Sequence, residues 1–514
     1  MYSSLRSIVC IAIGLLIALA LSSMPSRAAS GEKALKKRVK DLEGAVAALE
    51  AKLEHVSVAN GTLNGLAGPH IIFEGVNLHV RSGSGNSVDG TIELSTGQLT
   101  GEEPDGLGNV IIGYNEQAIF GGTANRDGSH NLVVGPGHTF SSVAGVVFGE
   151  ENRVTAPLAS VTGGATNTAS GLVASISGGQ AGTASGSASS VNGGYNNTAG
   201  GDYANVGGGE ANSADSNYAS VSGGAGNLAG DEYASVAGGY QNIAAKSYAS
   251  VTGGYLNVAG GNYASVVGGN SNVANGQYSV VAGGSKNIAS GDQSSITGGF
   301  DSEASGLRSS ITGGRENRAE ARFASVSGGQ HNRASGESAS VSGGRNNEAS
   351  EFAASASGGI SNNADADYAS VTGGAVNYAL GESSSVSGGV SNVAENQYAS
   401  ILGGDNNRAT GKSASVLGGY QNIASGEGAS ISGGWENRAS AVRASVLGGQ
   451  ENTASGEHSC VAGGVLNEAT SYYATVSGGS LNIASGTNSN ISGGTQGTAT
   501  GNDDWVAGAL FQDN

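Results

Sequence analysis

Cysteine, proline, aromatic residues and charge are all scarce in this sequence. Its 514 residues include two cysteines, Cys10 and Cys460, which can form neither a disulfide framework nor a thiolate metal cluster. There are only five prolines, and glycine does not recur at every third position, so a collagen-like fold is excluded. Charged residues make up only 12% of the chain, while Val, Ile and Ala recur at fixed positions, and this combination disfavours disorder.

Positive charge and catalytic motifs are also scarce. The 23 Lys and Arg are outnumbered by 41 Asp and Glu, which gives a formal net charge of −18 and argues against nucleic-acid binding. No carboxylate pair stands out from the background, and the Gly-x-Gly strings lack the strand and helix that flank a phosphate-binding loop. Five of the seven histidines have no close metal-ligand spacing: His55, His70, His79, His130 and His138. We therefore expect no enzymatic activity, no cofactor and no metal.

Only one long hydrophobic run is present, and it lies at the N-terminus. Arg6 precedes an apolar stretch from Ile8 to Leu21, and Ser26-Arg27-Ala28 has the small-x-small pattern of a cleavage site. The stretch is shorter than the roughly 20 residues that a membrane-spanning helix needs. Residues 1–28 are therefore predicted to be a cleaved secretory signal, so we expect an exported protein, extracellular or at a bacterial cell surface, without a transmembrane helix in the mature chain.

A heptad seam follows the signal. Residues 31–58 carry apolar side chains spaced alternately by four and three, namely Leu35, Val39, Leu42, Val46, Leu49, Leu53 and Val56. This narrow seam predicts an α-helical coiled coil. Val at the first core position of the heptad and Leu at the second favour a coiled coil of two helices. The run from Arg38 to Glu43 resembles the Arg-h-x-x-h-Glu signature of trimeric coiled coils, and on that basis we expect a homotrimer.

Glycine is abundant and strictly periodic. A Gly-Gly pair recurs with a fixed period of fifteen from Gly163-Gly164 to Gly493-Gly494, which makes 23 coils. A period sustained this long predicts a stacked array. Around each pair, residues alternate with the period of a strand, as in Ala249, Val251 and Gly253 on one side and Ser250 and Thr252 on the other. We predict an all-β fold, a parallel β-solenoid or β-roll of 15-residue coils over residues 146–510, with 511–514 as a C-terminal tail.

Three columns are predicted to run inside this solenoid. One is Val or Ile in every coil except at Ala356, one is Ala in all 23 coils, and one is Asn in 20 coils, with Gly182, Ser302 and Gly497 as the exceptions. We expect the asparagines to form a ladder in which each amide bonds the next. We expect the Gly-Gly pair to form a tight corner at positive φ. Each coil buries little apolar surface, so packing against sister chains would add stability.

Residues 59–145 break the regular repeat. Val76–Arg81 alternates like a half-buried strand. The segments 109–113 and 131–135 resemble degenerate coils separated by an insertion. Terminal coils of solenoids are atypical because they cap the core, so we expect this irregular segment to be a β cap; a binding site in the insertion is the alternative.

One outward column is the candidate contact stripe. Tyrosine occupies the same position in six successive coils, at Tyr203, Tyr218, Tyr233, Tyr248, Tyr263 and Tyr278. We expect these rings to stack from coil to coil, and the same rings are the best candidates for contact with a partner.

The repeat Ser-Val-x-Gly-Gly-x-x-Asn-x-Ala-x-Gly resembles the head repeats of YadA-like trimeric autotransporter adhesins, Ser-Val-Ala-x-Gly-x-x-Ser-x-Ala-x-Gly, over about residues 146–510. The resemblance implies a left-handed parallel β-roll that trimerises at a bacterial surface and binds host matrix or other cells. Two features differ. The family's C-terminal β-barrel anchor has no counterpart here, and its coiled coil follows the head, whereas here it precedes the repeats.

Together these observations predict a secreted or surface-displayed structural or adhesive solenoid that attaches to cells, matrix proteins or glycans as an oligomer. An ice-binding solenoid is one alternative, but the outward residues Thr252, Val267, Ala282 and Leu402 are too uneven for the flat Thr-x-Thr rows that ice binding needs. A polysaccharide-acting β-helix protein is the other alternative, and it would need carboxylates that depart from the repeat.

Overall fold

The computed structural model describes residues 29–88, 91–93, 98–100, 104–117 and 124–508. The predicted signal at 1–28, which includes Cys10, and the tail at 511–514 lie outside the described residues. The chain divides into one unit that ends at Val80 and a second that begins at Arg81, and each is described by itself.

The first unit contains one described helix and a small sheet. Helix α2 spans Ala29–Lys52, and strands β1 (Val56–Ala59) and β2 (His70–Phe73) pair antiparallel. The predicted helix is therefore present but shorter than the predicted seam, because Val56 pairs with Phe73 in the sheet instead of continuing the helix. Leu42 and Leu49 on the seam are each 60% exposed.

The strand predicted at Val76–Arg81 is wrong. These residues follow β2 without joining any described ladder, and Val76, Leu78 and Val80 are exposed. Alternation creates a strand only where a partner strand accepts the backbone hydrogen bonds, and none of the described strands pairs with this segment. The second unit begins at Arg81, and in it β3 (Thr91–Glu93) and β4 (Gln98–Thr100) pair antiparallel.

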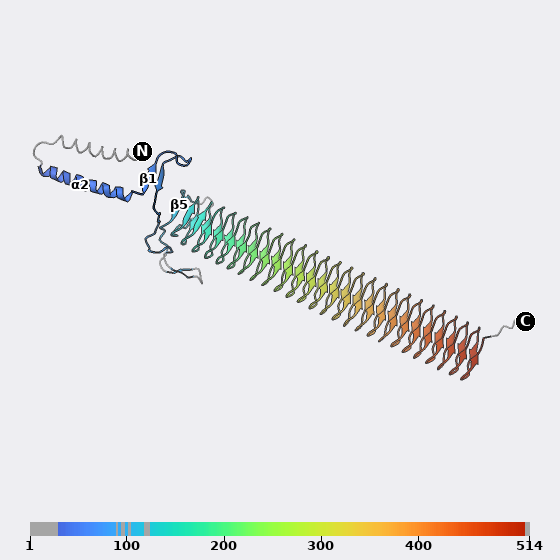
Figure 1. The fold of residues 1–514 in the computed structure, drawn as a ribbon. Coiled ribbons are helices and arrows are strands. Elements are labelled where there is room, and N and C mark those ends of the chain that lie inside the picture. Colours follow the sequence, from blue (N-terminus) through green and yellow to red (C-terminus); the bar gives the residue numbers. More distant parts are fainter. Residues whose placement is uncertain (1–28, 89–90, 94–97, 101–103, 118–123, 509–514) are drawn as a thin grey trace. The chain divides into compact units, whose positions relative to one another are not determined.

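The rest of the second unit is a parallel β-solenoid of about 25 coils of roughly 15 residues, as predicted (Figure 1). One ladder begins with β5 (Val110–Ile112), β6 (Leu132–Val134) and β8 (Val146–Phe148). It continues through even-numbered two-residue strands, one in each coil, from β10 (Ser160–Val161) to β56 (Trp505–Val506). We call it the valine ladder.

A second parallel ladder lines the other side of each coil. It begins with β7 (Thr139–Phe140) and β9 (Arg153–Val154) and continues through odd-numbered two-residue strands, again one in each coil, from β11 (Thr168–Ala169) to β55 (Thr498–Ala499). We call it the alanine ladder. Single bridges at the corner between the two ladders form a third line of pairing, from Glu150 to Thr495.

The core is a set of columns that run the length of the stack, as the repeat predicted. In the coil that begins at Ser250, the buried positions include Val251, Asn257, Ala259 and Ala264, whereas Thr252 is exposed. The Ala of the alanine ladder is fully buried in all 23 coils. A coil this short encloses room for only one branched side chain and several methyl groups, which explains why large residues are excluded from the interior.

The Gly-Gly corner follows the prediction at its second glycine. Gly254 has φ of +94°, and a Cβ there would lie 2.3 Å from the carbonyl oxygen of Gly269 in the next coil. A Cβ at Gly253 would meet nothing within 4 Å. The second glycine is therefore required by both conformation and the close approach of the next coil, while the first is not required by either.

The asparagine column is buried as predicted. The predicted amide-to-amide bonds form at some coils, as from Asn407 Nδ2 to Asn392 Oδ1 at 3.1 Å, whereas bonds to the backbone recur along the whole column. The side-chain oxygen of Asn257 accepts the backbone N–H of Asn272 at 3.0 Å. Its amide nitrogen donates to the carbonyl oxygens of Gly253 at 2.9 Å and Gly269 at 3.0 Å. The column thus ties side chain to backbone, because the corner leaves backbone groups that neither ladder bonds.

The segment before the regular repeats supplies the first coils of the stack. β5 and β6 are the degenerate coils that the sequence predicted, separated by the insertion, and β5 is the first strand of the valine ladder. Buried His138 takes the place of an asparagine there. Its Nε2–H donates to the carbonyl oxygen of Val134 at 3.0 Å, and its Nδ1 accepts the backbone N–H of Asn152 at 3.2 Å.

Candidate functional surfaces

The tyrosine column forms a continuous outward stack. Six rings, from Tyr203 to Tyr278, lie face to face with centroid separations of 4.7 to 5.0 Å and interplanar angles of 3° to 14°. The sequence placed these residues in one column, and the structure brings their rings together. Because ring faces are occupied by neighbouring rings, the column presents edges and hydroxyl groups to solvent along most of its length.

Backbone conformation holds each ring in place. Every tyrosine of the column has φ near +58°, in the left-handed region. Non-glycine residues seldom adopt this conformation, so the turn, and not intrinsic preference, sets the direction of the ring. Within the stack the pKa of Tyr233 is raised, first by partial burial and then by its neighbours Tyr248 and Tyr218. The phenol of Tyr233 therefore stays protonated and uncharged at neutral pH.

Aromatic and cationic residues continue outward columns beyond the tyrosines. Arg308 and Arg322 lie over the ring of Phe323, with guanidinium-to-centroid distances of 5.7 and 4.6 Å. Tyr240 and Tyr255 form a second, shorter stack at 5.4 Å. Sequence reasoning did not single out these pairs, although the period of the repeat would have placed Tyr240 beside Tyr255.

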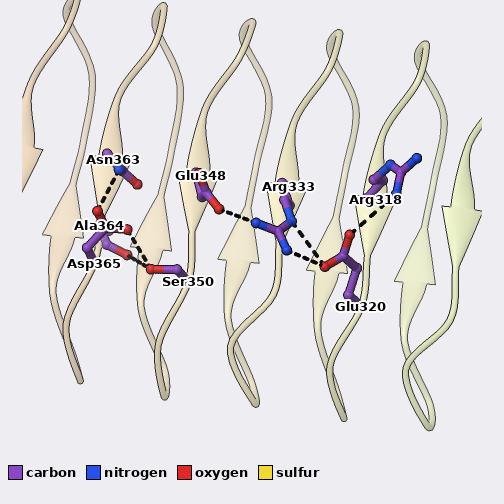
Figure 2. A network of polar contacts seen from close by, with 8 residues as sticks. All are labelled: Arg318, Glu320, Arg333, Glu348, Ser350, Asn363, Ala364 and Asp365. Carbon is purple, nitrogen blue, oxygen red and sulfur yellow. Dashed lines mark hydrogen bonds and ion pairs between the residues drawn. The ribbon is translucent and has the colours of Figure 1, made fainter.

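A charged network crosses four coils on the outer side of the alanine ladder (Figure 2). Arg333 contacts Glu320 at 2.7 Å and Glu348 at 2.6 Å, and Arg318 lies 3.7 Å from both Glu320 and Glu303. The hydrogen bond that Arg333 donates to Glu320 and the charge of both carboxylates raise the pKa of Arg333. Sequence reasoning missed this network, although residues one period apart in an outward column lie next to each other in adjacent coils.

A short polar cluster continues the line. Asp365 accepts hydrogen bonds from Ser350 Oγ at 2.5 Å and from Asn363 Nδ2 at 2.6 Å. The carboxylates of this network and cluster are therefore matched by donors in their own coil or the adjacent one. Such pairing is typical of a solvated face. Each exposed ion pair contributes only about 0–1 kcal/mol to the stability of the stack.

Metal-binding and membrane-spanning features were searched over the described ranges. No three His, Cys, Asp or Glu side chains there lie close enough to hold a metal ion together. No described helix combines the length and apolarity that crossing a bilayer requires. Of the five histidines singled out in the sequence, only His138 is fully buried, and its ring bonds backbone groups.

No protein-family model matches the chain, and no curated protein sequence matches it. The fold and its surface columns are therefore the basis for a functional assignment.

Proposed function

We propose that the protein is an exported structural or adhesive shaft of the YadA-like head type, secreted or displayed at a bacterial surface. The observation that carries this proposal is the unbroken parallel stack of about 25 coils, whose outward positions repeat at every coil. Such a shaft presents the same chemistry many times along one line. A partner with repeated features, such as a matrix protein or glycan, then gains avidity from many weak contacts.

The tyrosine column is the proposed contact stripe. Its six rings expose edges and hydroxyl groups, one ring in each coil. The solvent-exposed fraction of these tyrosines ranges from 40% to 58%. Aromatic rings with a polar tip supply contact area at low conformational cost, which is why Tyr is enriched at binding surfaces. Stacking holds the rings in place before a partner arrives.

Binding of the purified protein to arrays of matrix proteins and glycans tests the adhesive role. We expect a ligand whose affinity falls at least tenfold when Tyr218, Tyr233 and Tyr248 are changed to Ser. The matched control changes the separate rings Tyr368 and Tyr398 to Ser and keeps wild-type binding. Absence of any ligand on these arrays, or equal loss in both variants, would contradict the proposed stripe.

We propose that helix α2 associates as a homotrimeric coiled coil. Its seam residues Leu42 and Leu49 are exposed in the single chain, as expected for positions that a partner helix covers. Light scattering on Leu42→Asp/Leu49→Asp should show a lower mass than the wild type at equal concentration. Ala48→Asp, on the outer side of the same heptads, should leave the mass unchanged.

Ice binding and polysaccharide cleavage are the competing functions. The outer side of the valine ladder mixes Thr252 with Val267 and Leu402, so it lacks a regular threonine row. A clear thermal-hysteresis activity would favour the ice-binding alternative. Release of soluble products from bacterial polysaccharides would favour the enzyme.

A further inference from the structure

Two exposed aromatic rings lie next to each other in the corner column, the line of single bridges between the two ladders. Tyr420 and Trp435 occupy consecutive rungs, and their ring centroids lie 5.5 Å apart with the ring planes at 77°. The two residues are 39% and 52% exposed. Because the planes are nearly perpendicular, the pair offers aromatic surface to solvent in two directions, unlike the parallel rings of the tyrosine column.

Carboxylates surround this aromatic pair. Glu436 and Glu451 directly follow the corner column in consecutive coils, and Asp405 lies in the column one coil before the pair. The backbone N–H of Glu436 bonds the carbonyl oxygen of Tyr420 at 2.9 Å. The backbone N–H of Glu451 likewise bonds the carbonyl oxygen of Trp435 at 2.8 Å. Both glutamates have φ of +54°, so the turn fixes where their side chains begin, beside the two rings.

The charge of these carboxylates is not compensated within the chain. Trp435 Nε1–H donates to Glu436 Oε1 at 2.7 Å, which orients the carboxylate without adding a positive charge. Gln450 Nε2–H donates to Glu451 Oε1 at 2.7 Å in the same way. Over the described part of the chain, no ion pair includes Asp405, Glu436 or Glu451. One oxygen of each glutamate thus stays available to a charged donor.

The same two columns hold their own cations elsewhere in the stack. Phe300 lies in the corner column, and the charged groups of Lys286 and Arg315 lie over its ring at 5.6 and 5.5 Å. Glu316, in the adjoining column, pairs with Arg315 at 2.8 Å. An exposed ring and a carboxylate in these columns are therefore both matched there by basic residues of the chain.

The pair of Tyr420 and Trp435 has the rings and the carboxylates but not the cation. Among the described Lys and Arg side chains, none lies over either ring. Trp attracts cations more strongly than other aromatic rings do, and carboxylates form strong hydrogen bonds with charged donors. The net charge of −18 also raises the concentration of cations near the surface.

An ammonium group suits this arrangement better than a guanidinium. The free carboxylate oxygens belong to different coils, so a compact charge with three rotatable donors can reach more than one of them, whereas a planar fork matches a single carboxylate. We propose that this surface binds a lysine side chain of a partner protein. We call it the aromatic corner and define it by Asp405, Tyr420, Trp435, Glu436 and Glu451.

The aromatic corner is separate from the proposed contact stripe. In each coil the corner column precedes the alanine ladder, whereas the tyrosine column follows it, so the two lie at different turns. Lysine binding at the corner does not require that the tyrosine column have a ligand.

Intrinsic fluorescence tests the proposal, because Trp505→Phe leaves Trp435 as the only tryptophan of the full chain. The probe is an unstructured peptide of alternating Gly and Lys. The same peptide with every lysine acetylated, and therefore uncharged, is the control ligand. We expect the lysine peptide to change the emission of Trp435 saturably, with at least about tenfold weaker binding after acetylation. Added salt should weaken the binding of the lysine peptide.

Variants of the carboxylates separate the site from general attraction to an acidic protein. Glu436→Gln/Glu451→Gln keeps the reporting ring and should weaken binding of the lysine peptide about tenfold. The matched control, Glu427→Gln/Glu468→Gln, removes two exposed carboxylates outside the corner and should leave the affinity unchanged. Titration calorimetry on Trp435→Leu should show binding about threefold weaker than that of the wild type. Thermal unfolding of each variant checks that the coils remain folded.

Three results would overturn the proposal. One is an emission of Trp435 that the lysine peptide does not change, and another is equal weakening in both pairs of glutamate variants. The third is a neutral oligosaccharide that alters this emission where the lysine peptide does not, which would assign the corner to a glycan. Tyr218→Ser/Tyr233→Ser/Tyr248→Ser should bind the peptide like the wild type, so failure of the contact stripe and failure of the corner are distinguishable.

Discussion

At the scale of single residues, one buried asparagine bonds the backbone beside the Gly-Gly corner in 20 of the 23 regular coils. The side chain of Asn257 reaches three backbone groups, one in its own coil and two in the next. Buried backbone groups without partners cost about 1–3 kcal/mol each, so the column satisfies groups that would otherwise oppose stacking. Its near invariance has this physical cause.

Replacing Asn257 with Ala should therefore lower the free energy of unfolding by about 2 kcal/mol, because the N–H of Asn272 and the carbonyl of Gly253 lose their side-chain partner, while the carbonyl of Gly269 still accepts the N–H of Tyr255. Asn257→Ser should cost less. At Ser302, which stands in the same column, the hydroxyl accepts the backbone N–H of Asn317 at 3.2 Å. Chemical denaturation and amide exchange at Asn272 measure both effects. Equal stability of the alanine variant and the wild type would contradict the role given to this column.

Buried serines give the opposite prediction. The hydroxyl groups of Ser279, Ser294 and Ser309, in three consecutive coils, are buried without a hydrogen-bond partner. Changing all three to Ala, the common residue of that column, should raise the free energy of unfolding by about 1 kcal/mol or more per site. In Ser384 the same hydroxyl accepts the backbone N–H of Gly381 at 3.1 Å, so Ser384→Ala should be destabilising instead. Denaturation midpoints that shift the same way in both variants would refute this distinction.

At the scale of elements, the start of the stack depends on the protonation of one histidine. Burial lowers the pKa of His138 from its ordinary value of 6.5, and the nearby charge of Arg126 acts in the same direction. Only the neutral ring can accept the Asn152 N–H at Nδ1. A pKa depressed in the folded state means that stability is fully present above pH 6.5 and is lost as pH falls below it.

Amide exchange at Asn152 should therefore accelerate as pH drops from 7 toward 5, after correction for the intrinsic pH dependence of exchange. His138→Asn supplies the residue of the regular coils and should remove this additional dependence while keeping the bond. Protection at Asn152 that is constant over this range in the wild type would show that the ring does not titrate there.

The elements show which features the sequence determines and which it leaves open. The fixed period was enough to predict both ladders, the buried columns and the tyrosine stack, because each depends only on repetition. The bonding of Asn257 was not predictable, since spacing shows that side chains align but not which backbone groups the corner leaves free. Two predictions were wrong for one reason: the strand at Val76–Arg81 and the continuation of the helix beyond Lys52. In both cases the local pattern does not show whether a partner strand is available.

At the scale of the whole molecule, the solenoid is one-dimensional, and each coil contacts chiefly its neighbours. Removing one full period, residues 251–265, joins Ser250 to Val266 and restores a regular strand. The stack should shorten by one rung with little change in melting temperature. Removing only residues 251–258 places outward residues in the core and should lower the melting temperature markedly. Similar losses in both deletions would contradict stacking in register.

The central claim is that successive 15-residue segments lie on one another in register, and distances between spin labels on one column test it most directly. In a Cys460→Ser background, cysteines at Gln330 and Gln450 lie in the corner column eight coils apart, and those at Ser285 and Gln450 lie eleven coils apart. Dilution with unlabelled protein removes distances between chains. At about 4.8 Å per coil, double electron–electron resonance should give narrow distributions near 38 and 53 Å. Broad distributions, or distances that do not grow in proportion to the number of coils, would contradict the stack and the surfaces built on it.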